Sequence, residues 1–127
     1  QEKTLKEVEL IARETGKEFS TVANELLEEA VRMHRCPGIV FTEGTTGRRA
    51  RIAGAGMEVW EVIATYKSVN KDFKRLCSAY HWLTELQLKA ALGYYSLYSE
   101  EIDNLIKQNE ELTANNLRKR YPVLSRG

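Results

Sequence analysis

The stretch PGIVFTEGTTGRRARIAGAGMEVWEVIATY, residues 37–66, decides the fold of this chain. Two short β-type runs, Ile39–Thr42 and Arg48–Ala53, flank a turn rich in Gly and Thr, which predicts a β-hairpin. Gly54 and Gly56 then interrupt the second run and precede a helical pattern. In the second strand, every other residue shares one face of the sheet. We therefore expect the arginines of this strand to alternate with its apolar residues.

Three helices are predicted after the hairpin. Helical spacing of apolar residues recurs in three segments, 57–67, 70–80 and 84–98. Asn70 is suited to cap the second of these helices, and Thr84 with Gln87 forms a capping-box match at the start of the third. A basic hairpin ahead of three helices, with a tight turn between the last two, is the layout of a winged helix-turn-helix. This layout favours DNA binding and gene control over catalysis.

Two amphipathic helices are predicted before the hairpin. Thr4–Glu14 opens with a capping-box match and ends at Gly16, and Ser20 can cap a second helix. Candidate dimerisation residues lie on the apolar stripe of this second helix: Val22, Leu26, Leu27 and Ala30. An αα-hairpin of this size cannot bury both of its stripes alone. It therefore packs either on the rest of the chain or on a second copy, and both alternatives stay open.

The predicted fold class is mainly α with a short β-hairpin, in three segments. Residues 1–35 form a ribbon-helix-helix-like αα-hairpin for dimerisation, and residues 36–98 form the β-hairpin plus the helix-turn-helix unit. Residues 99–127 form a C-terminal helix, opened by Ser99, and a basic tail. We expect the residues from Ser99 onward to bind a partner, with a solvated tail over 117–124 as the alternative.

Charge is segregated along the chain although the formal net charge is only +1. Residues 1–31 carry four basic and eight acidic side chains, whereas residues 32–89 carry ten basic and five acidic. Because phosphates respond to the local density of cations, the hairpin and the three helices after it are the candidate surface for nucleic acid. A solvated basic surface without a partner is the alternative.

Nine residues are the candidate DNA contacts. Those expected to contact phosphates are Arg48, Arg49 and Arg51 of the hairpin and Lys71, Lys74 and Arg75 of the second helix. Those expected to face bases or phosphates at the start of the third helix are Thr84, Gln87 and Lys89. We expect the arginines and lysines to converge on a single cationic face. The third helix is apolar on two sides, which favours burial of both sides.

Other functional classes find little support in the sequence. The chain of 127 residues lacks an apolar run of the roughly 20 residues that span a membrane. Cys36 and Cys77 have no metal-ligand spacing, and we expect two free thiols in a reducing cytoplasm. His34 and His81 have no neighbouring group arranged as a catalytic partner. We expect no enzyme activity, no cofactor and no metal.

Residues 36–111 resemble the bacterial family named domain of unknown function 433. The resemblance is carried by four tracts: Pro37–Phe41, Gly47–Gly54, Val59–Ile63 and Leu83–Tyr95. The first 34 residues resemble the two helices of a ribbon-helix-helix antitoxin, although the short strand that precedes those helices in that family is not present here.

The resemblance implies an antitoxin-like transcription regulator of a bacterial type II toxin–antitoxin pair, similar to the VapB group. Such a protein binds its own operator, a double-stranded DNA, as a homodimer and occludes a cognate toxin with a terminal segment. The alternative is a protein–protein interaction module that does not bind DNA.

Overall fold

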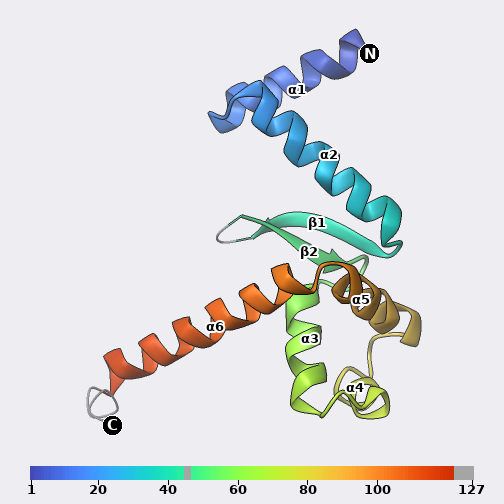
Figure 1. Ribbon diagram of the computed structural model, residues 1–127, viewed down its shortest axis with the longest axis vertical. Helices are drawn as coiled ribbons and strands as arrows, with labels where there is room; N and C mark the ends of the chain where they lie inside the picture. The colour runs from blue at the N-terminus through green and yellow to red at the C-terminus, as the bar shows by residue number, and fades with distance from the viewer. Residues whose placement is uncertain (45–46, 122–127) are drawn as a thin grey trace. The chain divides into compact units, whose positions relative to one another are not determined.

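The computed structural model describes residues 1–44 and 47–121 (Figure 1). These residues form six helices and one two-stranded antiparallel sheet, which confirms a mainly α fold with a short β-hairpin. The chain divides into two compact units, Gln1–Pro37 and Gly38–Gly127, and each is described by itself. The second unit contains both the hairpin and the C-terminal helix.

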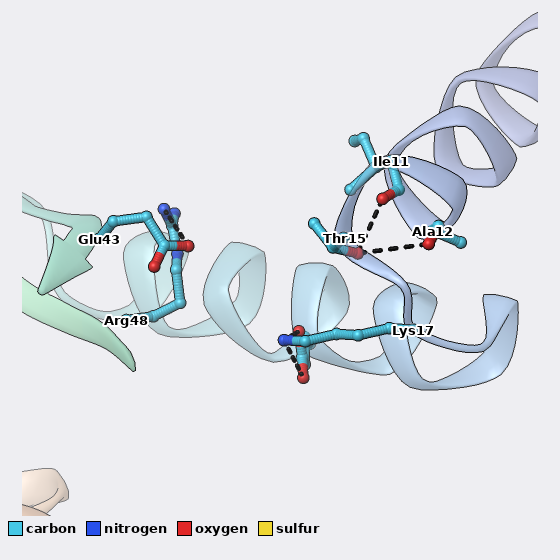
Figure 2. Close-up of polar contacts among 7 residues, drawn as sticks. Ile11, Ala12, Thr15, Lys17, Glu43 and Arg48 are labelled. Carbon is cyan, nitrogen blue, oxygen red and sulfur yellow. Dashed lines mark hydrogen bonds and ion pairs between the residues drawn. The ribbon is translucent and has the colours of Figure 1, made fainter. Parts of the chain in front are cut away.

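The first unit is a helical hairpin of α1 (Glu2–Thr15) and α2 (Phe19–Arg35). Gly16 ends α1 as predicted, in the left-handed region at φ 71°, where a residue without a Cβ is favoured. Thr15 Oγ1 donates to the Ile11 carbonyl at 2.8 Å, and Lys17 pairs with Glu25 at 3.1 Å (Figure 2). These contacts fix the tight turn between the two helices.

The predicted caps of α1 and α2 are wrong. The helix α1 begins at Glu2 with Gln1 as its N-cap, so Thr4 lies inside the first turn. The helix α2 begins at Phe19 with Glu18 as its N-cap, so Ser20 is a helical residue. Neither helix has a side-chain cap hydrogen bond, and each begins before the polar residue that was expected to start it.

The helices α1 and α2 leave much of their apolar surface exposed. Ala12 and Val22 are buried. The large apolar side chains exposed on this unit are Leu5, Leu10, Ile11, Phe19, Leu26, Leu27, Val31 and Met33. Exposed apolar side chains in this number typically mark a surface of association.

The second unit begins with the hairpin of β1 (Ile39–Gly44) and β2 (Gly47–Ile52). The strands pair in register from Ile39 with Ile52 to Gly44 with Gly47. Ala50 and Ile52 are buried, and the alternation predicted for this strand is confirmed. Thr45 and Thr46 of the predicted turn lie outside the described residues.

Three helices follow the hairpin: α3 (Val59–Ser68), α4 (Phe73–Ala79) and α5 (Glu85–Leu97). Both α4 and α5 contact α3, and α5 also contacts both strands. The core of this unit is drawn from the facing sides of these elements: Val59, Val62, Ile63, Leu76, Leu88, Ala91 and Tyr94.

The start of α4 differs from the prediction. The N-cap is Asp72, whose carboxylate accepts from the backbone N–H groups of Lys74 and Arg75. Asn70 and Lys71 instead adopt φ values of 58° and 59°, in the left-handed region that few residues other than Gly occupy. These two residues turn the chain sharply between α3 and α4.

Gly38 holds the first strand against α5. Its φ is 91°, and a Cβ at this position would lie 3.1 Å from the Cβ of Ala90. Its carbonyl accepts a hydrogen bond from the Ala53 N–H at 2.9 Å, just beyond the end of β2. The backbone here therefore needs both the conformation and the small volume of glycine.

The last helix, α6 (Ser99–Arg120), is packed at its beginning only. Ile102 is buried, and the helix contacts α3 and α5. From residue 107 to 121 its side chains are exposed except for Ala114, and the helix projects from α3 and α5 in Figure 1. Residues 122–124 of the predicted basic tail lie outside the described residues.

Candidate nucleic-acid interface

The hairpin arginine nearest the turn, Arg48, contacts its own strand pair. A guanidinium nitrogen donates to the Phe41 carbonyl at 3.2 Å. Another guanidinium nitrogen lies 3.8 Å from the Glu43 carboxylate (Figure 2). Glu43 pairs with Arg48 in the strand register, which brings the two side chains to neighbouring positions. The ion pair is exposed and long, so it contributes little to stability.

The other two hairpin arginines belong to a carboxylate–arginine cluster, which we define as Arg49, Arg51, Glu58 and Glu61. Arg49 Nε lies 3.5 Å from Glu58 Oε1, with the two side chains only 18% and 16% exposed. Arg51 forms an isolated β-bridge with Glu58 and donates from its guanidinium to the Gly56 carbonyl at 3.0 Å. The cluster thus joins β2 to the beginning of α3.

Burial and like charge act on the acids of this cluster. The pKa of Glu61 is raised mainly by burial and then by the charge of Glu58, while Arg51 opposes the shift. Among the described residues, Arg51 Nε and Glu58 Oε1 are buried without a hydrogen-bond partner. The arginines therefore compensate carboxylates that would otherwise be costly to bury.

The expected single cationic face is not found. The carboxylate–arginine cluster includes Glu58, the N-cap of α3, whereas Lys71 lies beyond the C-terminal end of the same helix. A helix of 10 residues is about 15 Å long at 1.5 Å per residue. In Figure 1 the hairpin and α4 accordingly lie at opposite ends of α3. The sequence shows that these cations belong to one basic segment. It does not show that Glu58 pairs with Arg49 in the folded protein.

A smaller set of exposed cations lies on α4, on α5 and in the turn before α4. We define the α4–α5 cationic face as Lys71, Lys74, Arg75 and Lys89, all of which are exposed. Lys89 Nζ of α5 lies 5.9 Å from the centre of the Phe73 ring, and Phe73 directly precedes Lys74 at the start of α4. Arg75 lies 3.8 Å from Asp72 in an exposed ion pair. Because such a pair contributes little free energy, Arg75 can leave Asp72 and bind another anion at little cost.

Thr84 and Gln87, which were expected to face bases, form hydrogen bonds within the protein instead. Thr84 and Gln87 form the predicted capping box, with distances of 3.1 and 2.9 Å between each side chain and the other's backbone N–H. Gln87 Nε2 also donates to the Ala53 carbonyl at 3.5 Å. These two side chains therefore fix the start of α5 and its distance from the hairpin.

Sequence reasoning missed two exposed apolar side chains beside this helix start. Trp82 is 60% exposed and Leu86 is 79% exposed, although Leu88 of the same helix is fully buried. The second apolar stripe of α5 was expected to be buried, but Leu86 and Leu97 at its two ends are exposed. Helical spacing identifies a stripe but not whether another element covers it.

The predicted dimerisation residues divide into two groups. Val22 is buried within the chain itself, so its side chain is not accessible to a second copy. Leu26, Leu27 and Ala30 are exposed, and Leu27 is the most exposed of the large apolar residues on α2.

The beginning of α6 is fixed by a polar network. Asp103 accepts hydrogen bonds from Lys67 Nζ at 2.6 Å and from Tyr95 Oη at 2.8 Å. The hydrogen bond from Lys67, followed by that from Tyr95, holds the pKa of Asp103 below its ordinary value, and the same bond to Asp103 raises the pKa of Lys67. Tyr94 Oη donates to Glu101 at 2.6 Å. These contacts set the direction of α6 relative to α3 and α5.

Comparison of the chain with protein-family models, curated proteins and solved structures found no match. Within residues 1–44 and 47–121, no helix is long and apolar enough to cross a membrane. Over the same residues, no three His, Cys, Asp or Glu side chains are grouped to hold a metal ion.

Proposed function

We propose that this protein is a DNA-binding, antitoxin-like transcription regulator that contacts duplex DNA through the α4–α5 cationic face. The observation that carries the proposal is the exposure of Lys74, Arg75 and Lys89 on the two helices that follow α3, and of Lys71 in the turn before the first of these helices. Two such helices, with the second one starting at a capped and exposed turn, are the elements that a helix-turn-helix presents to the major groove. Four cations there supply the attraction to phosphates.

The contacts of the hairpin arginines support a different role for the hairpin. Arg49 and Arg51 stabilise the junction of β2 and α3, and the hairpin positions α5 through the bond between Gln87 and Ala53. Arg48, at the exposed end of β2, is the hairpin residue best placed to add a phosphate contact.

The salt dependence of DNA binding tests the proposal. The chain's own upstream DNA is titrated with the wild type and with a triple variant, Lys74→Ala, Arg75→Ala and Lys89→Ala, over a salt series. If each cation neutralises one phosphate, the slope of log K against log salt becomes shallower by about 0.9 per lost contact. The matched control, Lys3→Ala, Lys6→Ala and Lys107→Ala, removes the same charge elsewhere and keeps the wild-type slope. Equal slopes for the two triple variants exclude this face as the DNA site.

The same proposal assigns dimerisation to α2 and toxin binding to α6. Leu26, Leu27 and Ala30 are exposed on α2, and sedimentation of Leu27→Glu is expected to show a monomer where the wild type is a dimer. Leu112 and Leu117 on α6, and Tyr121 directly after its last residue, are exposed beyond the packed part of the helix. We expect replacement of these three residues by Ser to abolish capture of a toxin encoded beside this chain without changing DNA affinity.

A protein–protein interaction module is the second candidate function. The row of exposed apolar residues on α1 and α2 favours it, because burial of this surface requires another partner but no DNA. In this case, association is apolar and changes little with salt, whereas binding that depends on phosphate contacts weakens steeply. Absence of any salt-sensitive DNA binding together with concentration-dependent dimerisation favours the module.

A further inference from the structure

The start of α5 presents large apolar side chains to the solvent beside its exposed polar residues Thr84 and Glu85. Thr84 and Gln87 are held in their capping box, so the exposed residues left on this part of the chain include Trp82 and Leu86. We call Trp82 and Leu86 the apolar pair. Their exposure costs solvation free energy in the isolated chain, and a contact that covers them recovers it.

The indole of Trp82 is fixed by its neighbours. Its ring packs edge-on against Tyr80, with ring centres 5.5 Å apart, and against His81 at 5.1 Å. Tyr80 is itself fixed, because its hydroxyl lies 2.9 Å from Thr65 Oγ1 and also donates to the Glu61 carbonyl. A side chain held in place before binding loses little conformational entropy when it is covered.

The charges around the apolar pair indicate what covers it. Lys89 follows Leu86 by three positions on α5 and therefore lies on the neighbouring part of the helix surface. Through Phe73, Lys89 is close to the start of α4, where Lys74 and Arg75 are exposed. An apolar contact bordered by cations fits the major groove, where phosphates flank the thymine 5-methyl group, the apolar group on the base edges.

We propose that the apolar pair contacts thymine 5-methyl groups, so that the protein selects DNA partly by methyl groups rather than by hydrogen bonds from α5. This inference rests on the DNA-binding function proposed above and specifies what the same face recognises. Glu85, which lies between the two residues and is exposed, is repelled by phosphate but can accept a hydrogen bond from the cytosine amino group. It therefore favours an orientation in which the start of α5 faces base edges.

Replacing thymine by uracil in the DNA tests this inference, because it removes only the methyl group from the groove. The chain's own upstream DNA is amplified with either dTTP or dUTP, and the affinity of the full-length protein for the two duplexes is compared. Each methyl group buried by the wild type is expected to contribute about four-fold to affinity, following the transfer free energy of one such group. The wild type should therefore bind the uracil duplex several-fold more weakly.

Variants of the protein complete a double-mutant cycle. Leu86→Ala and Trp82→Ala should each reduce the difference between the two duplexes, and the double variant should bind both with equal affinity. Leu97→Ala, which removes an exposed leucine from the other end of α5, should preserve the wild-type difference.

Three results would overturn the inference. Equal affinity of the wild type for the two duplexes overturns it alone and leaves the DNA-binding function standing. No binding to either duplex overturns the function and the inference together. Unchanged DNA affinity of the double variant with weaker self-association, measured by sedimentation, assigns the apolar pair to a protein interface instead.

Discussion

Arg49 Nε lies 3.5 Å from Glu58 Oε1, and this largely buried ion pair joins the second strand of the hairpin to the first turn of α3. A buried pair compensates the desolvation of both of its charges, so loss of one partner is more harmful than loss of an exposed pair. The stability of the second unit is therefore expected to depend on Arg49, which the sequence alone suggested as a DNA contact.

Replacement of Glu58 tests this dependence. Glu58→Ala removes the carboxylate that pairs with Arg49 and is expected to lower the free energy of unfolding by about 1–3 kcal/mol. The matched control is Glu43→Ala, which breaks the exposed pair with Arg48 and should cost at most about 1 kcal/mol. Urea unfolding followed by circular dichroism measures both. A similar loss for the two variants would contradict a structural role specific to the buried pair.

Truncation of two leucines on α5 is expected to change the stability of the protein by very different amounts. Leu88 is fully buried, and Leu88→Ala should destabilise the protein by about 2–5 kcal/mol through lost burial and a cavity. Leu86 is exposed, and Leu86→Ala should change stability by at most about 0.5 kcal/mol. Thermal unfolding of the two variants measures the difference. A marked loss of stability for Leu86→Ala would show that this residue is covered in solution.

The capping box of α5 is expected to contribute measurably to stability. Thr84→Ala removes the acceptor for the Gln87 N–H and should cost about 1 kcal/mol, which is typical for loss of an N-cap side chain. Thr84→Ser keeps the hydroxyl and should restore most of the wild-type stability. If both variants are equally unstable, the methyl group of Thr84 rather than its hydroxyl is the stabilising feature.

The contacts of Asp103 predict a loss of stability in acid. Because hydrogen bonds from Lys67 and then Tyr95 lower the pKa of Asp103 below its ordinary 3.8, folding favours the charged carboxylate. This contribution is fully present above about pH 5, where an unfolded aspartate is ionised, and is lost as the pH falls through the lower pKa of the folded state.

Melting temperatures of the wild type and Asp103→Asn between pH 2 and 7 measure this contribution. The advantage of the wild type should be constant above about pH 5, where aspartate is ionised in both states, and should shrink towards the acid end. Tyr95→Phe, which removes one of the two hydrogen bonds, should show a smaller advantage over Asp103→Asn with the same pH trend. An advantage that grows in acid would contradict the lowered pKa.

The parts of the fold that depend on near neighbours could be predicted from the sequence. The box of Thr84 and Gln87 spans three residues, and Gly16 ends α1 by its own conformational freedom, so local patterns were sufficient. The sequence predicts Asn70 as the cap of α4, whereas the cap is Asp72, a residue type that suits this position equally. The sequence alone does not show that the turn needs Asn70 in the left-handed region.

The candidate site was harder to predict because it depends on tertiary contacts. Arg49 and Lys74 look alike as basic residues in a basic segment, but a carboxylate of α3 pairs with Arg49, while the side chain of Lys74 is exposed. Leu86 and Leu88 likewise share the same chemistry and differ only in what lies opposite them. Neither distinction is encoded in spacing or composition.

The hydrogen bond that Gly38 accepts from Ala53 determines where the chain can be cut to separate the two units. Because the Gly38 carbonyl accepts the bond that closes the base of the hairpin, a fragment that starts at Ile39 loses this acceptor and frays there. Truncation for independent expression should therefore leave Gly38 in the C-terminal fragment, and an inserted spacer or protease site belongs before this glycine.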